Sequence, residues 1–299
     1  MKLIDGKLVS EQIKEEIKKE VAAMIDMDER APHLAAVIVG EDPASQTYVG
    51  SKEKNCTSVG ITSTIYRMEE STSEKKLLDI IDFLNNDNDV DGIIVQLPLP
   101  KHIDEQKIIA AIDPKKDVDG FNPENVGKMV LGRDTFISAT PMGIMEMLKR
   151  YKIETEGKNC VIIGRSNIVG TPMAILMSRP KTLGNSTVTL CHSKTKNLKE
   201  IAKTADILIV AMGKPNFVTE DMVKEGAVVI DVGIHRVEDK TKKSGFRLIG
   251  DVDFENVSKK ASWITPVPGG VGPTTISALL LNTLKARKNA GSQPMNKDD

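Results

Sequence analysis

Lys52 interrupts the apolar face of an expected helix. Residues 43–59, which contain the run TYVGSKEKN, are predicted to form a helix that is capped by Asp42 and ends at Gly60. At about 100° per residue, Lys54 points away from the face that should turn inward. That inward face comprises Ser45, Tyr48, Val49, Lys52, Cys56 and Val59.

A lysine on such a face has three explanations. It can reach the surface along its aliphatic stem, it can pair with a buried acid, or it can be held partly out of water for chemistry. In the third case desolvation favours the neutral amine, which can then accept a proton near neutral pH.

Two further polar residues favour the chemical explanation. Gln96 interrupts GIIVQLPLP at the carboxyl end of an expected strand, where open parallel sheets bind ligands. Asp119 lies in the loop KKDVDGF, directly before a glycine. Each has an ordinary explanation, because the backbone can satisfy the Gln96 amide and an aspartate before glycine often accepts a local N–H. Together with Lys52 they form a candidate catalytic site.

The run CVIIGRSNIVGTPMAILM indicates a strand, a glycine-containing turn and a helix. Gly164 and Gly170 bracket the turn, and Ser166 stands where the usual dinucleotide fingerprint has its second glycine. A pyrophosphate at the helix N-terminus would gain from free N–H groups and from the helix dipole. The alternative is a tight turn that binds nothing.

The end of the next strand indicates which cofactor would bind. An NAD enzyme normally offers an acid there to the ribose 2′-hydroxyl. This chain has TLCHSKT instead, with His192, Ser193 and Lys194, and Arg165 adds a cation in the glycine turn. A 2′-phosphate suits that setting, so we predict NADP.

The run TPVPGGVGPTT, residues 265–275, is the most unusual in the chain. Its prolines fix the approach of the backbone, and Pro273 is expected to open the final helix. Gly269 and Gly270 let the backbone come close to a flat ligand or adopt positive φ.

The elements that must position these residues alternate between strand and helix. Runs rich in Val, Ile and Leu, separated by helices, indicate parallel sheets covered on both faces, and thus an α/β fold. The expected strands are 34–40, 61–68, 90–99, 158–164, 186–192, 206–213, 227–233 and 261–267, with helices at 43–59 and 73–86.

The strands fall into two series, which predicts two domains. The break lies near a helix that starts after Pro141. We predict a catalytic domain of residues 1–140 with 273–290, a doubly wound, Rossmann-like nucleotide domain of residues 141–272, and a disordered polar tail, 291–299.

Composition excludes several classes of partner. A net charge of −1 gives no global attraction to nucleic acid or membrane, and 3% aromatic residues argue against base-stacking surfaces. No run approaches the roughly 20 apolar residues of a membrane span, and the first twenty residues resemble a helix rather than a signal peptide. Three cysteines without metal-ligand spacing are expected to be buried, reduced thiols. We therefore expect a cytoplasmic protein without a metal.

Five blocks resemble those of a known family. TYVGSKEK, VQLPLP, KDVDGF, GRSNIVGTP and TPVPGGVGPTT, in this order, are similar to the signature blocks of the bifunctional methylenetetrahydrofolate dehydrogenase/methenyltetrahydrofolate cyclohydrolase family. The resemblance extends to about residue 288. It implies a homodimer of two-domain subunits that binds folate in the cleft between the domains.

The resemblance also implies two reactions. NADP takes a hydride from 5,10-methylenetetrahydrofolate, and water then opens the 5,10-methenyl product to 10-formyltetrahydrofolate. Lys52 would be essential for the hydrolysis and Gln96 would tune its amine, while Tyr48 would stack on the folate rings and Asp119 would accept hydrogen bonds from the pterin. Further folate contacts would come from Val95, Leu97, Pro268, Gly269, Gly270, Val271 and Gly272. NADP would be held by Gly164, Arg165, Ser166, Ser193 and Ile234.

Two other interpretations remain at this point. A dehydrogenase of another small substrate, such as a hydroxy acid, generally needs an Arg clamp near a His or Lys relay. The four histidines, His33, His102, His192 and His235, do not cluster in sequence with such an Arg clamp. A catalytically silent NADP-binding protein would explain the glycine turn but would leave Lys52 without a purpose.

Overall fold

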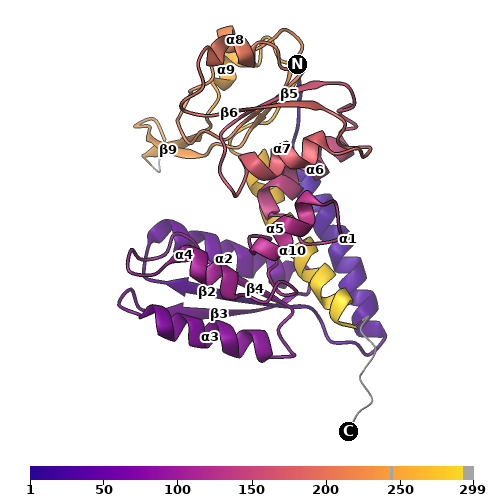
Figure 1. Ribbon diagram of the computed structural model, residues 1–299, viewed down its shortest axis with the longest axis vertical. Helices are drawn as coiled ribbons and strands as arrows, with labels where there is room; N and C mark the ends of the chain where they lie inside the picture. The colour runs from indigo at the N-terminus through magenta and orange to yellow at the C-terminus, as the bar shows by residue number, and fades with distance from the viewer. Residues whose placement is uncertain (243–244, 292–299) are drawn as a thin grey trace. The chain divides into compact units, whose positions relative to one another are not determined.

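The computed structural model describes residues 1–242 and 245–291, with only the backbone at 43 and 44. The chain divides into two compact units (Figure 1). The lysine unit comprises residues 12–139 and the chain from 276 onward, and the glycine unit comprises residues 1–11 and 140–275. The predicted domain limits at 140 and 273 lie within three residues of these limits.

The first eleven residues differ from the predicted division. Strand β1 (Lys2–Leu3) pairs in parallel with β11 (Trp263–Ile264), and the Lys2 amide donates to the Ser262 carbonyl at 2.8 Å. The N-terminus thus extends the sheet of the glycine unit. Two residues are too few for an alternating pattern, so the sequence predicted only the helix that follows.

The lysine unit is built on a parallel sheet of order β3-β2-β4. Every residue of the central strand from 34 to 39 is buried, as its apolar sequence predicts for a strand covered on both faces. Figure 1 shows α3 on one side of this sheet and α2 on the other. The elements are β2 (His33–Val39), α2 (Pro43–Ser58), β3 (Thr62–Met68), α3 (Glu74–Asn86) and β4 (Gly92–Val95).

Local signals set the ends of these elements. The Asp42 carboxylate accepts from the Ser45 amide at 2.7 Å, and Gly60 leaves α2 at φ +82°, so both predicted ends of that helix are confirmed. Strand β4 ends at Val95, four residues before the predicted end. Beyond it Pro98 has no N–H to donate, so the ladder cannot continue.

The remaining helices of the lysine unit include two long ones that lie side by side. Arg287 on the last helix forms an ion pair with Glu29 at 3.7 Å, and Lys288 pairs with Glu20. The short helices α4 and α5 were not predicted; Asp104 and Asn122 cap them. The helices are α1 (Gly6–Asp26), α4 (Glu105–Ala111), α5 (Pro123–Val130) and α10 (Val271–Gly291), and α1 and α10 contribute residues to both units.

The glycine unit is built on a parallel sheet of order β1-β11-β8-β7-β5-β6. The chain passes from β5 to β6 on one side and then returns to β7 on the other. This reversal is the topological switch point at which doubly wound sheets bind ligands. The further strands are β5 (Asn159–Ile163), β6 (Thr187–Cys191), β7 (Ile207–Val210) and β8 (Val228–Asp231).

Helices and a hairpin complete the glycine unit. An antiparallel hairpin of β9 (His235–Glu238) and β10 (Phe246–Ile249) was not predicted. Cys160 and Cys191 are buried free thiols here, as Cys56 is in the lysine unit, which confirms that prediction. The helices are α6 (Ala139–Arg150), α7 (Gly170–Ser178), α8 (Leu198–Ala202), the 3₁₀ turn η1 (Glu220–Met222) and α9 (Phe254–Val257).

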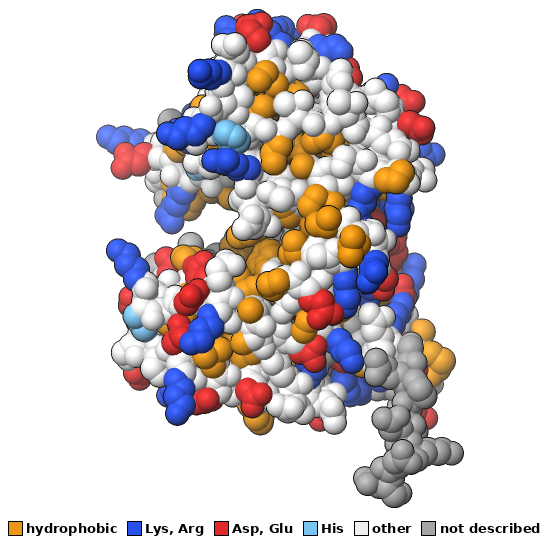
Figure 2. All heavy atoms as spheres, viewed as in Figure 1, with side chains coloured by type: hydrophobic (Ala, Val, Ile, Leu, Met, Phe, Trp, Pro, Cys, Tyr) orange, Lys and Arg blue, Asp and Glu red, His pale blue; other side chains and the backbone are white. Residues whose placement is uncertain are grey.

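The surface and the termini bear on the predicted partners. Cationic and anionic side chains are interspersed over the face shown in Figure 2, as the net charge of −1 leads one to expect. Within the described residues, no helix combines the length and the apolar character that a membrane span requires. Helix α10 ends at Gly291, so the rest of the predicted tail, 292–299, lies outside the described residues.

Candidate active site

Lys52 lies on the inward side of α2, as the periodicity predicts. Val49, Cys56 and Val59 on the same side are buried, whereas Lys54 is exposed. The Lys52 side chain is half-buried, and its Nζ donates to Oε1 of Gln96 at 3.2 Å. The partner of the amine is therefore an amide, and not the buried acid that one of the three explanations of an inward lysine would require.

Gln96 is held both through its side chain and through its backbone. Its Nε2 donates to the Leu97 carbonyl at 2.7 Å, and its backbone N–H donates to the Val37 carbonyl at 2.8 Å. Because the amide nitrogen is engaged by a carbonyl, the oxygen must face Lys52. The Gln96 amide is therefore satisfied partly by backbone, as its ordinary explanation expects, and its oxygen contacts Lys52, while its role in a site remains a prediction.

Asp119 is carried by a loop that is tied to the sheet and to α10. Asp117, two residues earlier, bridges to Ile93 of β4. The Asn282 side chain donates to the carbonyls of Val118 and Ile137 at 2.8 and 2.9 Å. Gly120 follows at φ +71°, where a Cβ would press on the backbone of residues 137 and 138. These contacts fix the backbone on both sides of Asp119, whose side chain is half-buried.

The charge of Lys52 acts on its surroundings. Burial raises the pKa of Asp119, the Lys52 ammonium opposes that rise, and Asp117 adds to it. Burial likewise raises the pKa of the Cys56 thiol to about 12, although its hydrogen bond with Ser63 and the Lys52 charge lower it. Cys56 is therefore a protonated thiol and no nucleophile at neutral pH.

The other predicted folate contacts of the lysine unit flank this group. Tyr48 lies one turn before Lys52 on α2, but 41% of it is exposed, so it is not part of the packed face. Val95 is the last residue of β4 and is buried, and Leu97 follows Gln96 directly. The structure thus brings Lys52, Gln96 and Asp119 to one region and leaves the Tyr48 ring accessible.

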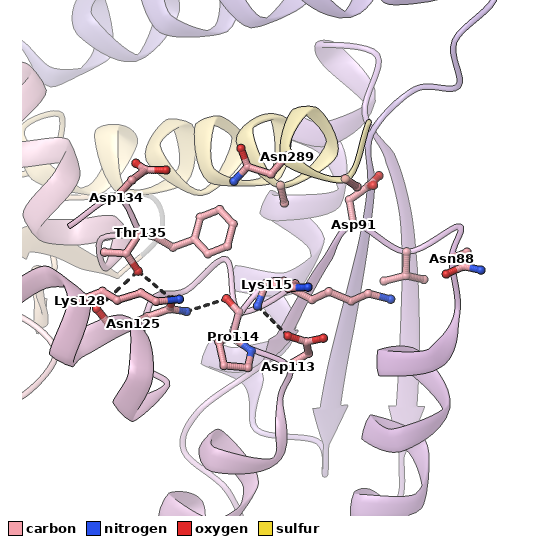
Figure 3. Close-up of a pocket in the computed structure, with 15 residues that line it drawn as sticks. Asn88, Asp91, Asp113, Pro114, Lys115, Asn125, Lys128, Asp134, Thr135 and Asn289 are labelled. Carbon is pink, nitrogen blue, oxygen red and sulfur yellow. Dashed lines mark hydrogen bonds between the residues drawn. The ribbon is translucent and has the colours of Figure 1, made fainter. Parts of the chain in front are cut away.

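A cavity of about 580 Å³ lies elsewhere in the lysine unit (Figure 3). None of its lining residues belongs to the predicted site. Several of its charged groups serve the fold instead: Lys116 donates to the carbonyls of Leu84 and Asp87, and Asp91 binds Arg30 at 2.6 Å. Asn125 donates to the Pro114 carbonyl. The cavity therefore takes no part in the chemistry that the sequence predicts.

The glycine turn of the second unit has the form that a pyrophosphate requires. Gly164 follows β5 at φ +121°, and a Cβ there would overlap the Ala211 carbonyl. A Cβ at Gly170 would overlap the Gly164 carbonyl, so both positions need glycine. The N-terminus of α7 lies at the carboxyl edge of the sheet, where the helix dipole favours an anion, although the Thr171 amide already donates to the Ser166 carbonyl at 3.0 Å and Pro172 has no N–H.

The side chains of the turn are open to solvent. Arg165 and Ser166 are exposed, and the Ser166 hydroxyl accepts from the Val169 amide at 3.1 Å. Ser193 is exposed just after β6, and Ile234, 55% exposed, follows β8. All four lie beyond the carboxyl ends of parallel strands, so the residues present fit a bound dinucleotide phosphate.

The proline- and glycine-rich segment is anchored within the same unit. Gly269 has φ +108°, and its carbonyl accepts from the Lys7 amide at 3.1 Å. A Cβ at Gly6, the first residue of α1, would overlap the Gly270 carbonyl. The start of α1 therefore holds residues 268–272 in place.

Comparison with known proteins agrees with this geometry. Residues 4–119 match the catalytic domain of tetrahydrofolate dehydrogenase/cyclohydrolase, and residues 138–291 match its NAD(P)-binding domain. The chain belongs to the tetrahydrofolate dehydrogenase/cyclohydrolase family. The bifunctional protein FolD of Cytophaga hutchinsonii is 60% identical over 286 residues, which are 96% of this chain and 99% of that protein.

Solved structures of this family superpose closely. The bifunctional enzyme FolD of Campylobacter jejuni has a TM-score of 0.91 and 50% identity, over 97% of this chain and 99% of that chain. The Trypanosoma brucei methylenetetrahydrofolate dehydrogenase-cyclohydrolase, solved with NADP and an inhibitor, has a TM-score of 0.91 and 38% identity, over 97% and 98% of the two chains. Family membership confirms the predicted two-domain α/β fold, the two enzyme activities and the nicotinamide cofactor.

Asn282 is a residue that the sequence did not single out. It lies on α10, 163 positions after Asp119, yet its amide holds the loop in which Asp119 stands. An asparagine within the apolar pattern LLLNTL was the one available signal. Its partners are backbone carbonyls, which carry no sequence signature.

Proposed function

We propose that this chain oxidises 5,10-methylenetetrahydrofolate with NADP and hydrolyses the methenyl product to 10-formyltetrahydrofolate, with Lys52 acting in the hydrolysis. The single observation that carries the role of Lys52 is its hydrogen bond to the fixed Gln96 amide on the half-buried face of α2.

One amine can serve the hydrolysis twice. The methenyl carbon is electrophilic, so water adds there once the water gives up a proton, which the Lys52 amine accepts. The bond from this carbon to N5 then breaks, N5 takes the proton back from Lys52, and the carbinol O–H releases its proton to solvent as the formyl group forms on N10. The net change is the addition of one water and the release of one proton.

The neighbours of Lys52 orient the reactants. Gln96 holds the amine through its oxygen, which limits the positions that the amine can take. Tyr48, with its accessible ring one turn away, would stack on the folate. The Asp119 carboxylate would accept N–H groups of the pterin, with Val95, Leu97 and residues 268–272 as further contacts.

The dehydrogenase step depends mainly on positioning. When bound, NADP accepts the hydride of the methylene carbon. In this chain Gly164 and the N-terminus of α7 would hold the pyrophosphate, with Arg165, Ser166, Ser193 and Ile234 as further contacts. Lys194 and Arg165 supply cations where an NAD enzyme would supply an acid, which supports NADP over NAD.

Assembly and location complete the proposal. We keep the predictions of a cytoplasmic location and of a homodimer, and the family resemblance supports the homodimer. Light scattering coupled to size-exclusion chromatography would measure the mass of the assembly, and a mass of 32.6 kDa would contradict the dimer.

The substitution Lys52→Met tests the role of Lys52. We expect it to lower kcat for methenyltetrahydrofolate hydrolysis by about 10²–10⁴, the usual contribution of a proton-transfer group. NADP should bind with unchanged Kd in calorimetry, because Lys52 is not a proposed nucleotide contact. The matched control is Lys54→Met, two residues away on the exposed side of α2, which should keep both activities. Undiminished hydrolysis in Lys52→Met would eliminate the proposed role.

A further inference from the structure

Two buried carboxylates lie at the carboxyl edge of the glycine unit, outside the predicted site. Asp231 is the last residue of β8 and is 3% exposed, and Asp251, in the loop after β10, is fully buried. A buried carboxylate is costly unless hydrogen bonds compensate it. The partners of these two show what they do.

Asp251 binds the turn that follows β7. Its Oδ2 accepts from the amides of Met212 and Gly213 at 2.6 and 2.9 Å, and its Oδ1 accepts from the Lys214 amide at 2.9 Å. Oδ1 also contacts Nε2 of His235 at 2.7 Å. One carboxylate thus holds three successive backbone amides and one side chain.

Asp231 holds the segment that follows β8. Its Oδ1 accepts from the amides of Gly233 and Asp251 at 2.9 Å each, and its Oδ2 accepts from the Val252 amide at 3.0 Å. The two carboxylates are therefore linked, because the backbone amide of Asp251 is a partner of Asp231.

Glycines make room for both carboxylates. A Cβ at Gly233 would meet the amide nitrogen and carboxylate of Asp251, and a Cβ at Gly250 would overlap the carboxylate of Asp231. Each acidic group thus fills the space that a side chain would take. This explains the glycines of DVGIH and LIGDVD, which the dinucleotide fingerprint does not.

Ile234 lies between two residues that the buried carboxylates hold. Its neighbour Gly233 is bound to Asp231, and its neighbour His235 is bound to Asp251. The strands themselves are held by their ladders, with β7 between β5 and β8. Loss of Asp251 would therefore loosen residues 212–214 and 235 and leave the sheet paired.

We propose that Asp251 is a positioning residue for NADP, which fixes the turn 212–214 and the segment around Ile234 in the conformation that meets the cofactor. This rests on the proposed assignment of Ile234 to the NADP site. Asp251 itself is fully buried beneath that surface.

The substitution Asp251→Asn tests the proposal. The variant keeps the shape of the side chain but replaces one carboxylate oxygen by an NH₂ group. That group faces backbone N–H donors, so the hydrogen bonds that the oxygen accepted are lost. We expect Kd for NADP, measured by calorimetry, to rise at least tenfold. Hydrogen exchange of amides 212–214 in the enzyme without NADP should speed up at least tenfold. Hydrolysis of added methenyltetrahydrofolate, which consumes no NADP, should stay within twofold.

Matched variants make the result decisive. Asp253→Asn, two residues away and bound to Asn256 rather than to the turn, should leave Kd and exchange unchanged. If Asp251→Asn does not fold, His235→Asn keeps the carboxylate and should raise Kd about threefold. An unchanged Kd in a folded Asp251→Asn, or an equal loss of both activities, would overturn the proposal. An unchanged Kd in Arg165→Ala and Ile234→Gly would refute the assigned NADP contacts instead, independently of the exchange rates.

Discussion

At the scale of the residue, the decisive feature is an amide whose orientation is not free. The Gln96 nitrogen donates to the Leu97 carbonyl, which leaves only the oxygen for Lys52. The lysine is thereby held by a neutral acceptor rather than by a carboxylate. The amide therefore fixes the position of the Lys52 amine through a single hydrogen bond.

The substitution Gln96→Met tests how much of the hydrolysis rate depends on the position of the Lys52 amine rather than on its presence. The variant keeps the length of the side chain but removes the oxygen that accepts from Lys52. We expect kcat for hydrolysis to fall about tenfold, less than in Lys52→Met, because the amine is present but no longer held. Stopped-flow absorbance of methenyltetrahydrofolate would measure it.

Gln106, exposed on α4, provides the control, since Gln106→Met should leave hydrolysis unchanged. Equal losses in Gln96→Met and Lys52→Met would mean that the amide does chemistry itself, contrary to its proposed role.

Residue-scale prediction from the sequence succeeded where the signal was local. The inward position of Lys52 follows from the helical period, and the need for glycine at 164 follows from the fingerprint. Asp251 and Asn282 could not be found in this way. Their partners are backbone groups far along the chain, which any residue could supply.

At the scale of the element, α10 holds the loop that carries Asp119 through hydrogen bonds. Asn282 is 1% exposed and donates both amide hydrogens to the carbonyls of Val118 and Ile137. These carbonyls belong to separate segments, which the one side chain joins. The helix thus links the loop that carries Asp119 to the segment before α6.

Asn282→Ala should loosen that link. One buried and one partly buried carbonyl would lose their donor, so we expect the free energy of unfolding to fall by about 2–3 kcal/mol in urea denaturation. The KM for folate in the hydrolysis should rise about threefold to tenfold, because Asp119 would be less well fixed. Asn289→Ala, on the exposed part of the same helix, should change neither quantity. A loss of stability without any change in KM would confine Asn282 to a structural role.

Element-scale prediction failed for short pieces and succeeded for long ones. Helices α2 and α3 have caps and several turns of periodic sequence, whereas α4 and α5 have seven and eight residues. The hairpin β9–β10 has mixed polar and apolar residues with no two-residue turn motif, so no pattern marked it.

At the scale of the molecule, Asp231 links the stability of the enzyme to pH. Burial raises its pKa from the ordinary 3.8 to about 6, the Asp251 charge adds to the rise, and three backbone hydrogen bonds oppose it. The folded state therefore binds this proton more tightly than the unfolded chain does. The stabilisation that results is complete below pH 3.8 and is lost as pH rises through about 6.

Asp231→Asn should remove that dependence. Between pH 4 and 6 we expect the wild-type enzyme to lose about 2 kcal/mol of unfolding free energy relative to the variant, which is most of the roughly 3 kcal/mol that a shift of about two units carries at 1.36 kcal/mol per unit. Urea denaturation at intervals across this range would measure the difference.

Asp221→Asn is the control of opposite sign. Lys199 and Thr219 lower the pKa of Asp221 to about 2, so its contribution is lost only as pH falls below the ordinary value. This variant should therefore run parallel to the wild type from pH 4 to 6. Parallel curves for Asp231→Asn would contradict the tight proton binding inferred for Asp231.

The space shared by Gly250 and Asp231 makes these two positions interdependent. A methyl group at 250 has no room while the acid is present, because it would occupy the volume of the carboxylate. Once residue 231 is shortened, the same methyl group fits. A screen of random variants would thus record Gly250→Ala as harmful by itself and as nearly silent beside Asp231→Ala, and would recover the pair together more often than either change alone suggests.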